Sequence, residues 1–167
     1  MGNLNNVKTF ERRFLVDDLP FDLNEYPFLD IEQGYLNTDP EIRVRRCNQK
    51  YTLTVKSCEG LEKNENEQEI LAASFKELFN NIRSNVILKR RYQVTYDNFD
   101  IIIDDYQGQF KGLRIAKVNF VNEIEALNFN KPKWFLEEVT NDSFYKSKTL
   151  ALLTRKEISK KKIKSLK

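Results

Sequence analysis

Basic side chains recur at every second position in several segments of this 167-residue chain. Val44 separates Arg43 from Arg45, and Lys89 and Arg91 again stand two residues apart. Residues two apart on a strand point to the same face, so each pair presents two cations to one side of a sheet. Arginine binds phosphate oxygens in pairs, and lysine supplies a mobile point charge. The pattern indicates binding of a phosphate-rich anion.

Carboxylates and apolar residues follow the same alternation. Thr54 and Lys56 share one face of their segment, and Leu53 and Val55 share the other. Acidic side chains are interleaved with the basic ones, and among basic residues carboxylates ordinarily hold Mg²⁺ or Mn²⁺, which bridges phosphate oxygens. The candidate metal ligands are Glu11, Glu65, Glu67 and Asp104, with Glu69 on the same face as Glu65 and Glu67.

Two architectures explain such strands. In an ordinary antiparallel sheet the charged face lies in water. Alternatively, a closed barrel surrounds the charged face, and helices cover the apolar residues outside. Isolated buried charges cost several kcal/mol or more per ion, so water, counter-charges and a polyanion would have to fill that interior. Because the apolar faces also need cover, we expect the barrel.

Composition excludes several classes of protein. The chain has no histidine, which removes histidine-dependent triads and histidine-ligated zinc sites. No apolar run reaches the roughly 18 to 20 residues of a membrane span. Residues 1–8 lack the apolar stretch of a secretory signal. We therefore expect a cytoplasmic protein without a membrane partner.

Most of the chain has the two-residue period of strands. One helix is expected after Ser74 and Glu77, which have the spacing of a capping box, and the residues after 132 are expected to be helical. The predicted strands are 9–16, 32–36, 41–47, 51–58, 63–70, 85–96, 99–106 and 112–122. The fold class is therefore α+β, mostly β.

No repeat or linker divides the chain, so we expect one domain over 1–154. Residues 155–167 carry seven basic residues against one acid, Glu157. This basic tail is a solvated helix end or a contact for nucleic acid or another acidic partner.

Taken in order, these segments resemble the CYTH, or triphosphate tunnel, family, in particular its short bacterial members. The similarity runs from about Phe10 to Ala151. The matching pieces are FERRFLV (10–16), QGYL (33–36), TDP (38–40), RVR (43–45), LTVK (53–56), KRRY (89–92), WFLEEVT (134–140) and YKSK (145–148). The resemblance implies a closed eight-stranded antiparallel tunnel and metal-dependent hydrolysis or cyclisation of triphosphates.

The resemblance also implies roles for individual residues. Tyr35 and Lys89 fall where some short members pair a tyrosine with a lysine near the attacking water, and they are the catalytic candidates. The phosphate-binding candidates are Arg13, Arg43, Arg45, Lys56, Lys89, Arg91, Lys117 and Lys148.

The acidic residues of the family match less well. Thr9 replaces the first glutamate of the opening motif, and Ile102 replaces an acid before Asp104. Lys117 and Asn119 stand where the family has a metal-binding glutamate pair. The four remaining metal candidates would form a weak site or none, so Mg²⁺ or Mn²⁺ is expected if the chain is catalytic, and no cofactor otherwise. Lys117 could replace the charge of the missing ion.

Three functions follow from this pattern. The first is binding of a triphosphate, polyphosphate or nucleotide, with metal-dependent catalysis weakened or lost. The alternative is an active divalent-metal-dependent triphosphatase acting on inorganic or nucleoside triphosphate, and adenylyl cyclase activity ranks below it. The third is a scaffold that acts through the basic tail. The ligand beyond its phosphates and the oligomeric state, a homodimer included, stay open.

Overall fold

The computed structural model describes residues 10–59 and 62–160, with the side chains of 57–64 and 159–160 left out. Nine strands form one sheet in the order β5-β4-β3-β2-β6-β7-β8-β1-β9, and all neighbours are antiparallel. The strands are β1 (Phe10–Val16), β2 (Phe28–Thr38), β3 (Glu41–Cys47), β4 (Lys50–Glu59), β5 (Glu62–Glu69), β6 (Ile87–Tyr96), β7 (Phe99–Tyr106), β8 (Arg114–Phe120) and β9 (Phe135–Glu138). The mostly antiparallel β architecture is confirmed.

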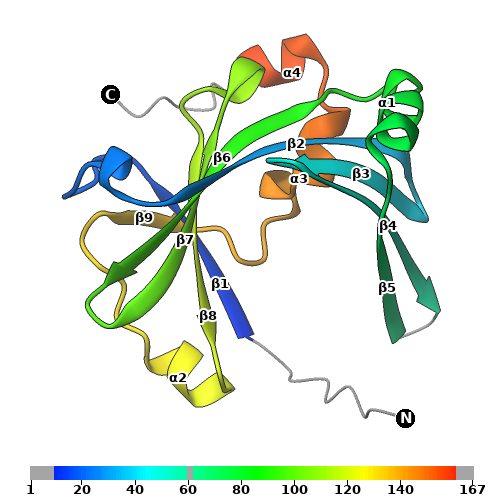
Figure 1. Ribbon diagram of the computed structural model, residues 1–167. Helices are drawn as coiled ribbons and strands as arrows, with labels where there is room; N and C mark the ends of the chain where they lie inside the picture. The colour runs from blue at the N-terminus through cyan, green and yellow to red at the C-terminus, as the bar shows by residue number, and fades with distance from the viewer. Residues whose placement is uncertain (1–9, 60–61, 161–167) are drawn as a thin grey trace.

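The prediction of a closed eight-stranded barrel needs correction. The sheet has nine strands, and among the described residues no backbone pairing joins its end strands, β5 and β9. Figure 1 shows a strongly curved sheet, with β4 and β5 on one side, β1 and β8 on the other, and α3 between them. Curvature therefore brings the two halves of the sheet face to face without closing the hydrogen-bonded ring.

Within the described ranges, four helices accompany the sheet: α1 (Ala72–Asn80), α2 (Glu123–Asn128), α3 (Ser147–Leu152) and α4 (Arg155–Lys160). Short 3-10 turns lie at Leu23–Glu25, Gly108–Phe110 and Ser143–Tyr145. The remainder of the predicted basic tail, 161–167, lies outside the described residues. No helix in the described part of the chain is both long and apolar enough to span a bilayer.

The convex face of β1, β6, β7 and β8 carries a large apolar cluster. Phe14, Val94, Ile103 and Val118 on these strands are fully buried. Residues from α2 and from the segment before β9, among them Phe129, pack against them. On these strands Arg13, Lys89, Arg91, Asp104 and Lys117 occupy the alternate positions, so the two-residue period turns them toward the concave face.

A second apolar cluster lies where α3 meets the sheet. Leu150 of α3 is buried beside Tyr35, Ile87 and Tyr106. The residues that begin α3 line the concave side of the sheet. Unlike a helix packed wholly outside the sheet, α3 contributes its first turn to the interior.

Gly34 permits a close approach on the outer face of β2. A Cβ at this position would lie 2.2 Å from Cδ1 of Ile82, in the chain that follows α1. The missing side chain lets this chain rest on β2, while the neighbouring Gln33 and Tyr35 face the interior. Tight packing outside thus holds the strand that presents two site residues inside.

Candidate anion-binding site

The concave face encloses a cavity of about 480 Å³. Its lining comes from β1, β2, β3, β4, β6, β8 and the start of α3, and nine of the lining side chains are lysine or arginine against two acids. The lining residues are Arg13, Gln33, Tyr35, Thr38, Asp39, Glu41, Arg43, Arg45, Lys56, Lys89, Arg91, Lys117, Lys146, Ser147 and Lys148. All eight predicted phosphate-binding residues and Tyr35 are in this set.

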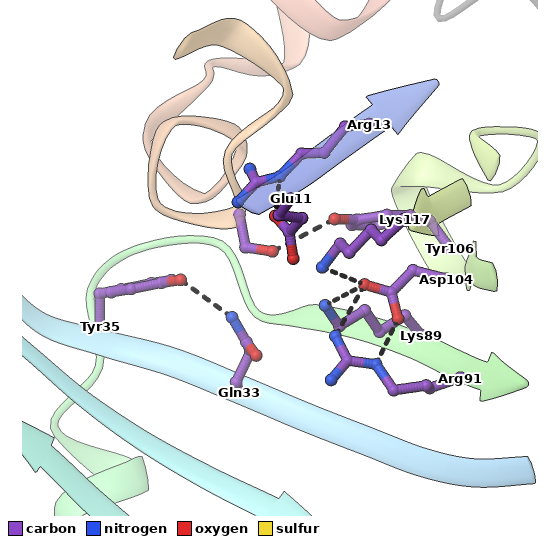
Figure 2. A network of polar contacts seen from close by, with 10 residues as sticks. Glu11, Arg13, Gln33, Tyr35, Lys89, Arg91, Asp104, Tyr106 and Lys117 are labelled. Carbon is purple, nitrogen blue, oxygen red and sulfur yellow. Dashed lines mark hydrogen bonds and ion pairs between the residues drawn. The ribbon is translucent and has the colours of Figure 1, made fainter. Parts of the chain in front are cut away.

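Asp104 of β7 forms the buried base of a cationic cluster (Figure 2). Its Oδ2 lies 2.8 Å from Nζ of Lys89 and 3.0 Å from Nζ of Lys117. Nε of Arg91 donates to Oδ1 at 2.7 Å, and Nη2 donates to Oδ2 at 2.9 Å. Three cations from β6 and β8 therefore share one carboxylate, which is 0% exposed.

The cluster shifts the acidity of its members. Burial alone would raise the pKa of Asp104, but Lys89, Arg91 and Lys117 hold it well below its usual range. The pKa of Lys89 is lowered to about 7, chiefly by burial; Asp104 opposes this shift, and Lys117 and Arg91 add to it. Asp104 is therefore charged at neutral pH, whereas Lys89 gains or loses its proton near pH 7.

Arg45 on β3 forms no ion pair with a described acid, although the charge of Glu67 attracts it. Its side chain makes no hydrogen bond or ion pair with another described residue, and its Nε is buried without a partner. Burial lowers the pKa of Arg45, and the positive charges of Arg43 and Arg91 add to that shift. An anion in the cavity would relieve both the lost hydration and the repulsion.

Arg43 is more fully paired. Its Nη2 donates to Oγ1 of Thr54 at 3.0 Å, and that hydroxyl donates to Glu67 at 3.0 Å. Glu41 lies 3.8 Å and Glu67 3.6 Å from its guanidinium, but Nε of Arg43 is buried without a partner. These contacts fix the guanidinium and leave one donor unused.

The remaining predicted cations lie nearer to acidic partners at the rim. Nε of Arg13 lies 2.5 Å from Glu11, and Nζ of Lys56 lies 2.8 Å from Glu65. Lys148 approaches Glu41 at 3.8 Å. The side chains of Arg13, Lys56 and Lys148 are all partly exposed. Their ion pairs are accordingly weaker than those around Asp104.

Tyr35 and Lys89, the catalytic candidates, do not touch each other; among the described residues no hydrogen bond or ion pair joins them. Instead Nε2 of Gln33 donates to the Tyr35 hydroxyl at 2.9 Å (Figure 2). Burial raises the pKa of Tyr35 to about 12, with Arg43 opposing the shift. Tyr35 therefore keeps its proton and can donate it in a hydrogen bond.

Sequence reasoning did not identify Gln33 as a site residue. It is 1% exposed, and its Oε1 is buried without a hydrogen-bond partner. Its position two residues before Tyr35 on β2 was a usable signal, because both side chains must share a face. Lys146 and Ser147 also line the cavity. Lys146 precedes α3 and Ser147 begins it, so the two-residue period of strands could not predict which way their side chains point.

The predicted metal ligands do not form a cluster. In the part of the chain that the structure describes, no three acidic or cysteine side chains lie together as a metal site requires. Glu11 is paired with Arg13, Glu65 with Lys56, and both oxygens of Asp104 face cations; Glu67 lies near Arg43. A divalent ion would have to displace these partners. The donors present do not fit Mg²⁺ or Mn²⁺.

Comparison with known proteins was made by sequence and by structure. No family model matches the chain. A curated inorganic triphosphatase of Nitrosomonas europaea is 35% identical over 146 residues, which cover 85% of this chain and 95% of the relative. This chain belongs to the CYTH, or triphosphate tunnel, family.

Two further matches agree with this membership. An inorganic triphosphatase of Acetivibrio thermocellus is 34% identical over 122 residues, covering 71% of this chain and 77% of the relative. A solved crystal structure of an inorganic triphosphatase superposes with a TM-score of 0.75 at 34% identity, covering 89% of this chain and 97% of that chain.

Proposed function

We propose that the chain hydrolyses inorganic triphosphate to phosphate and diphosphate. The observation that carries the proposal is the convergence of nine described lysine and arginine side chains on one cavity, with Nε of Arg45 buried and without a hydrogen-bond partner. Two relatives that align with most of this chain are named inorganic triphosphatases. Their names support hydrolysis over the binding without turnover that the sequence placed first.

Arg43 and Arg45 would hold phosphate oxygens from β3, and Lys89, Arg91 and Lys117 would hold them from β6 and β8. In phosphoryl transfer the protein acts mainly by positioning the groups and stabilising charge on the phosphate oxygens. The fixed guanidinium of Arg43 suits positioning, because its bonds to Thr54 and its nearby acids hold it in place.

Gln33 and Tyr35 would orient the attacking water. The unpaired Oε1 of Gln33 is a neutral acceptor beside many cations, so it can accept a hydrogen bond from a water molecule. The Tyr35 hydroxyl already accepts a hydrogen bond from Gln33, and its own proton is free to be donated. The water oxygen would then form a bond to the terminal phosphorus while the phosphoanhydride bond breaks and diphosphate leaves, and the proton released by the water would pass to a phosphate oxygen.

The lining favours inorganic triphosphate over a nucleotide. Of the described residues that line the cavity, Tyr35 alone is aromatic, and its ring is buried. A nucleotide base ordinarily needs an apolar or aromatic surface for stacking. A nucleoside triphosphatase or an adenylyl cyclase is therefore the weaker proposal for this cavity.

The test is phosphate release from sodium triphosphate, compared with ATP, by the purified chain. Arg45→Ala should lower kcat/KM for triphosphate by roughly 100-fold, because a charge-assisted contact to the substrate is lost. Arg46→Ala is the matched control, since Arg46 is the next residue on β3, points outward and pairs with Glu32 at 3.0 Å. Equal loss in both variants, or faster hydrolysis of ATP than of triphosphate, would reject the assignment.

A further inference from the structure

The cations around Asp104 are incompatible with a divalent metal ion bound at that carboxylate. The family resemblance implies a divalent ion beside the phosphates, yet Lys117 Nζ lies 3.0 Å from the Asp104 carboxylate. An ammonium at that distance from the carboxylate repels a second cation there. The other candidate acids, Glu11 and Glu65, also have cationic partners.

We propose that this cavity binds triphosphate as the metal-free anion, with the ammonium of Lys117, beside Lys89 and Arg91 on Asp104, supplying the charge that a divalent ion would otherwise supply. The proposal rests on the proposed function, since it concerns the same ligand and the same cavity.

The net charge of the cluster around Asp104 supports the proposal that its cations replace a divalent ion. Three cations share the single carboxylate of Asp104, so the group carries a net charge of +2 when all three are protonated, equal to that of Mg²⁺. Asp104 is fully buried behind them, whereas Lys117 is 16% exposed on its cavity side. The carboxylate therefore anchors the cations, and their excess charge faces the cavity.

The two neighbours of Lys117 on β8 determine the direction of its side chain. Its strand neighbours Ala116 and Val118 are fully buried in the convex apolar cluster. Their burial fixes the register of β8, so the residue between them must face inward. Across the pairing of β1 with β8, Lys117 lies opposite Arg13, another cavity cation. Two cations thus stand side by side, and Arg13 forms an ion pair with Glu11.

The experiment is titration calorimetry of the full chain with sodium triphosphate, either with EDTA or with excess Mg²⁺. We expect tight binding in EDTA. Excess Mg²⁺ should weaken the apparent affinity, because Mg²⁺ complexes free triphosphate and competes with the protein for it. Absence of binding in EDTA together with binding in Mg²⁺ would overturn the proposal without any variant.

Lys117→Gln should weaken binding in EDTA at least about tenfold, as expected for loss of one charged contact. Arg114→Gln is its control on the same strand, because Arg114 pairs with Asp105 and lies outside the cavity lining while carrying the same charge. Its affinity should match that of the unmodified chain. Equal weakening in the two variants, or none in Lys117→Gln, contradicts a specific role for Lys117.

The two proposals fail separately. Binding in EDTA without phosphate release under any condition would reject hydrolysis and retain metal-free binding. Phosphate release with Mg²⁺, combined with no binding in EDTA, would retain hydrolysis and reject metal-free binding.

Discussion

The Nζ atom of Lys117 on β8 lies 3.0 Å from Oδ2 of Asp104 on β7, although the two residues are not directly paired across the sheet. Lys117 pairs with Ile102, so its side chain reaches diagonally to the carboxylate two positions along β7. The same oxygen also faces Lys89 and Arg91. One buried aspartate thereby positions cations from the strands on both of its sides.

Replacing Asp104 with asparagine should destabilise the chain. Three cations would lose their common counter-charge, and breaking a buried pair costs about 3–5 kcal/mol. Asp105→Asn breaks the partly exposed pair with Arg114 and should cost about 1 kcal/mol or less. Denaturant unfolding measures both changes. Added triphosphate should restore part of the loss in Asp104→Asn, and equal losses in the two variants would contradict the role of Asp104.

Arg45→Gln should weaken triphosphate binding by roughly 10- to 100-fold and leave the ligand-free chain equally stable or slightly more stable. The reason is that Arg45 is buried near Arg43 and Arg91 and forms no ion pair in the described structure. Calorimetry and denaturant unfolding give the two quantities. A large fall in the free energy of unfolding would mean that Arg45 has a structural role instead.

When triphosphate binds at about pH 8, Lys89 should take up a proton. Its pKa in the free chain is about 7, lowered by burial and by Lys117 and Arg91 against Asp104, and a bound polyanion raises it. Calorimetry in buffers of different ionisation enthalpy measures the uptake. Lys89→Met provides the comparison, and an unchanged uptake in that variant would contradict the assignment.

The lowered pKa of Lys89 also makes the free energy of unfolding depend on pH. Between pH 7 and 10.5 the unfolded chain retains the lysine proton that the folded chain has lost. Protonation therefore favours the unfolded state in this window, and the contribution of Lys89 to the free energy of unfolding rises with pH. Lys89→Met should remove that rise in denaturant unfolding, and a rise of equal size in the variant would contradict it.

Tyr35→Phe should lower kcat for triphosphate roughly 10- to 100-fold and change KM little, because the phenol orients water rather than phosphate in the proposed mechanism. The pH profile between about pH 6 and 9 should keep its shape, since the pKa of Tyr35 is about 12. Steady-state phosphate release measures both. A change confined to KM would assign Tyr35 to substrate binding.

Strand alternation predicted which side chains face the concave side of the sheet better than it predicted the closure of the sheet. The apolar positions of β7 and β8 face the convex cluster, and therefore Asp104 and Lys117 face inward as their period requires. The predicted bounds of β3 and β7 agree with the structure. Closure could not be predicted, because it depends on pairing between the two end strands, and no local pattern records that pairing.

Helix signals were less reliable. Ser74 and Glu77 do not cap α1; Leu71 is the N-cap residue, no side chain caps it, and Ser74 lies within the helix. The segment 134–139 contains good helix formers, yet Phe135–Glu138 is strand β9. Pairing with the free edge of β1 and burial of Phe135 outweigh the local propensity.

The surplus of cations in the cavity has a practical consequence for handling the protein. Any multivalent anion that enters will bind the folded chain and not the unfolded one, so it shifts the folding equilibrium by mass action. Thermal midpoints recorded in phosphate or sulfate should exceed those in chloride-based buffers of equal ionic strength. The buffer salt therefore determines whether a biophysical measurement reports on the free chain or on the anion-bound chain.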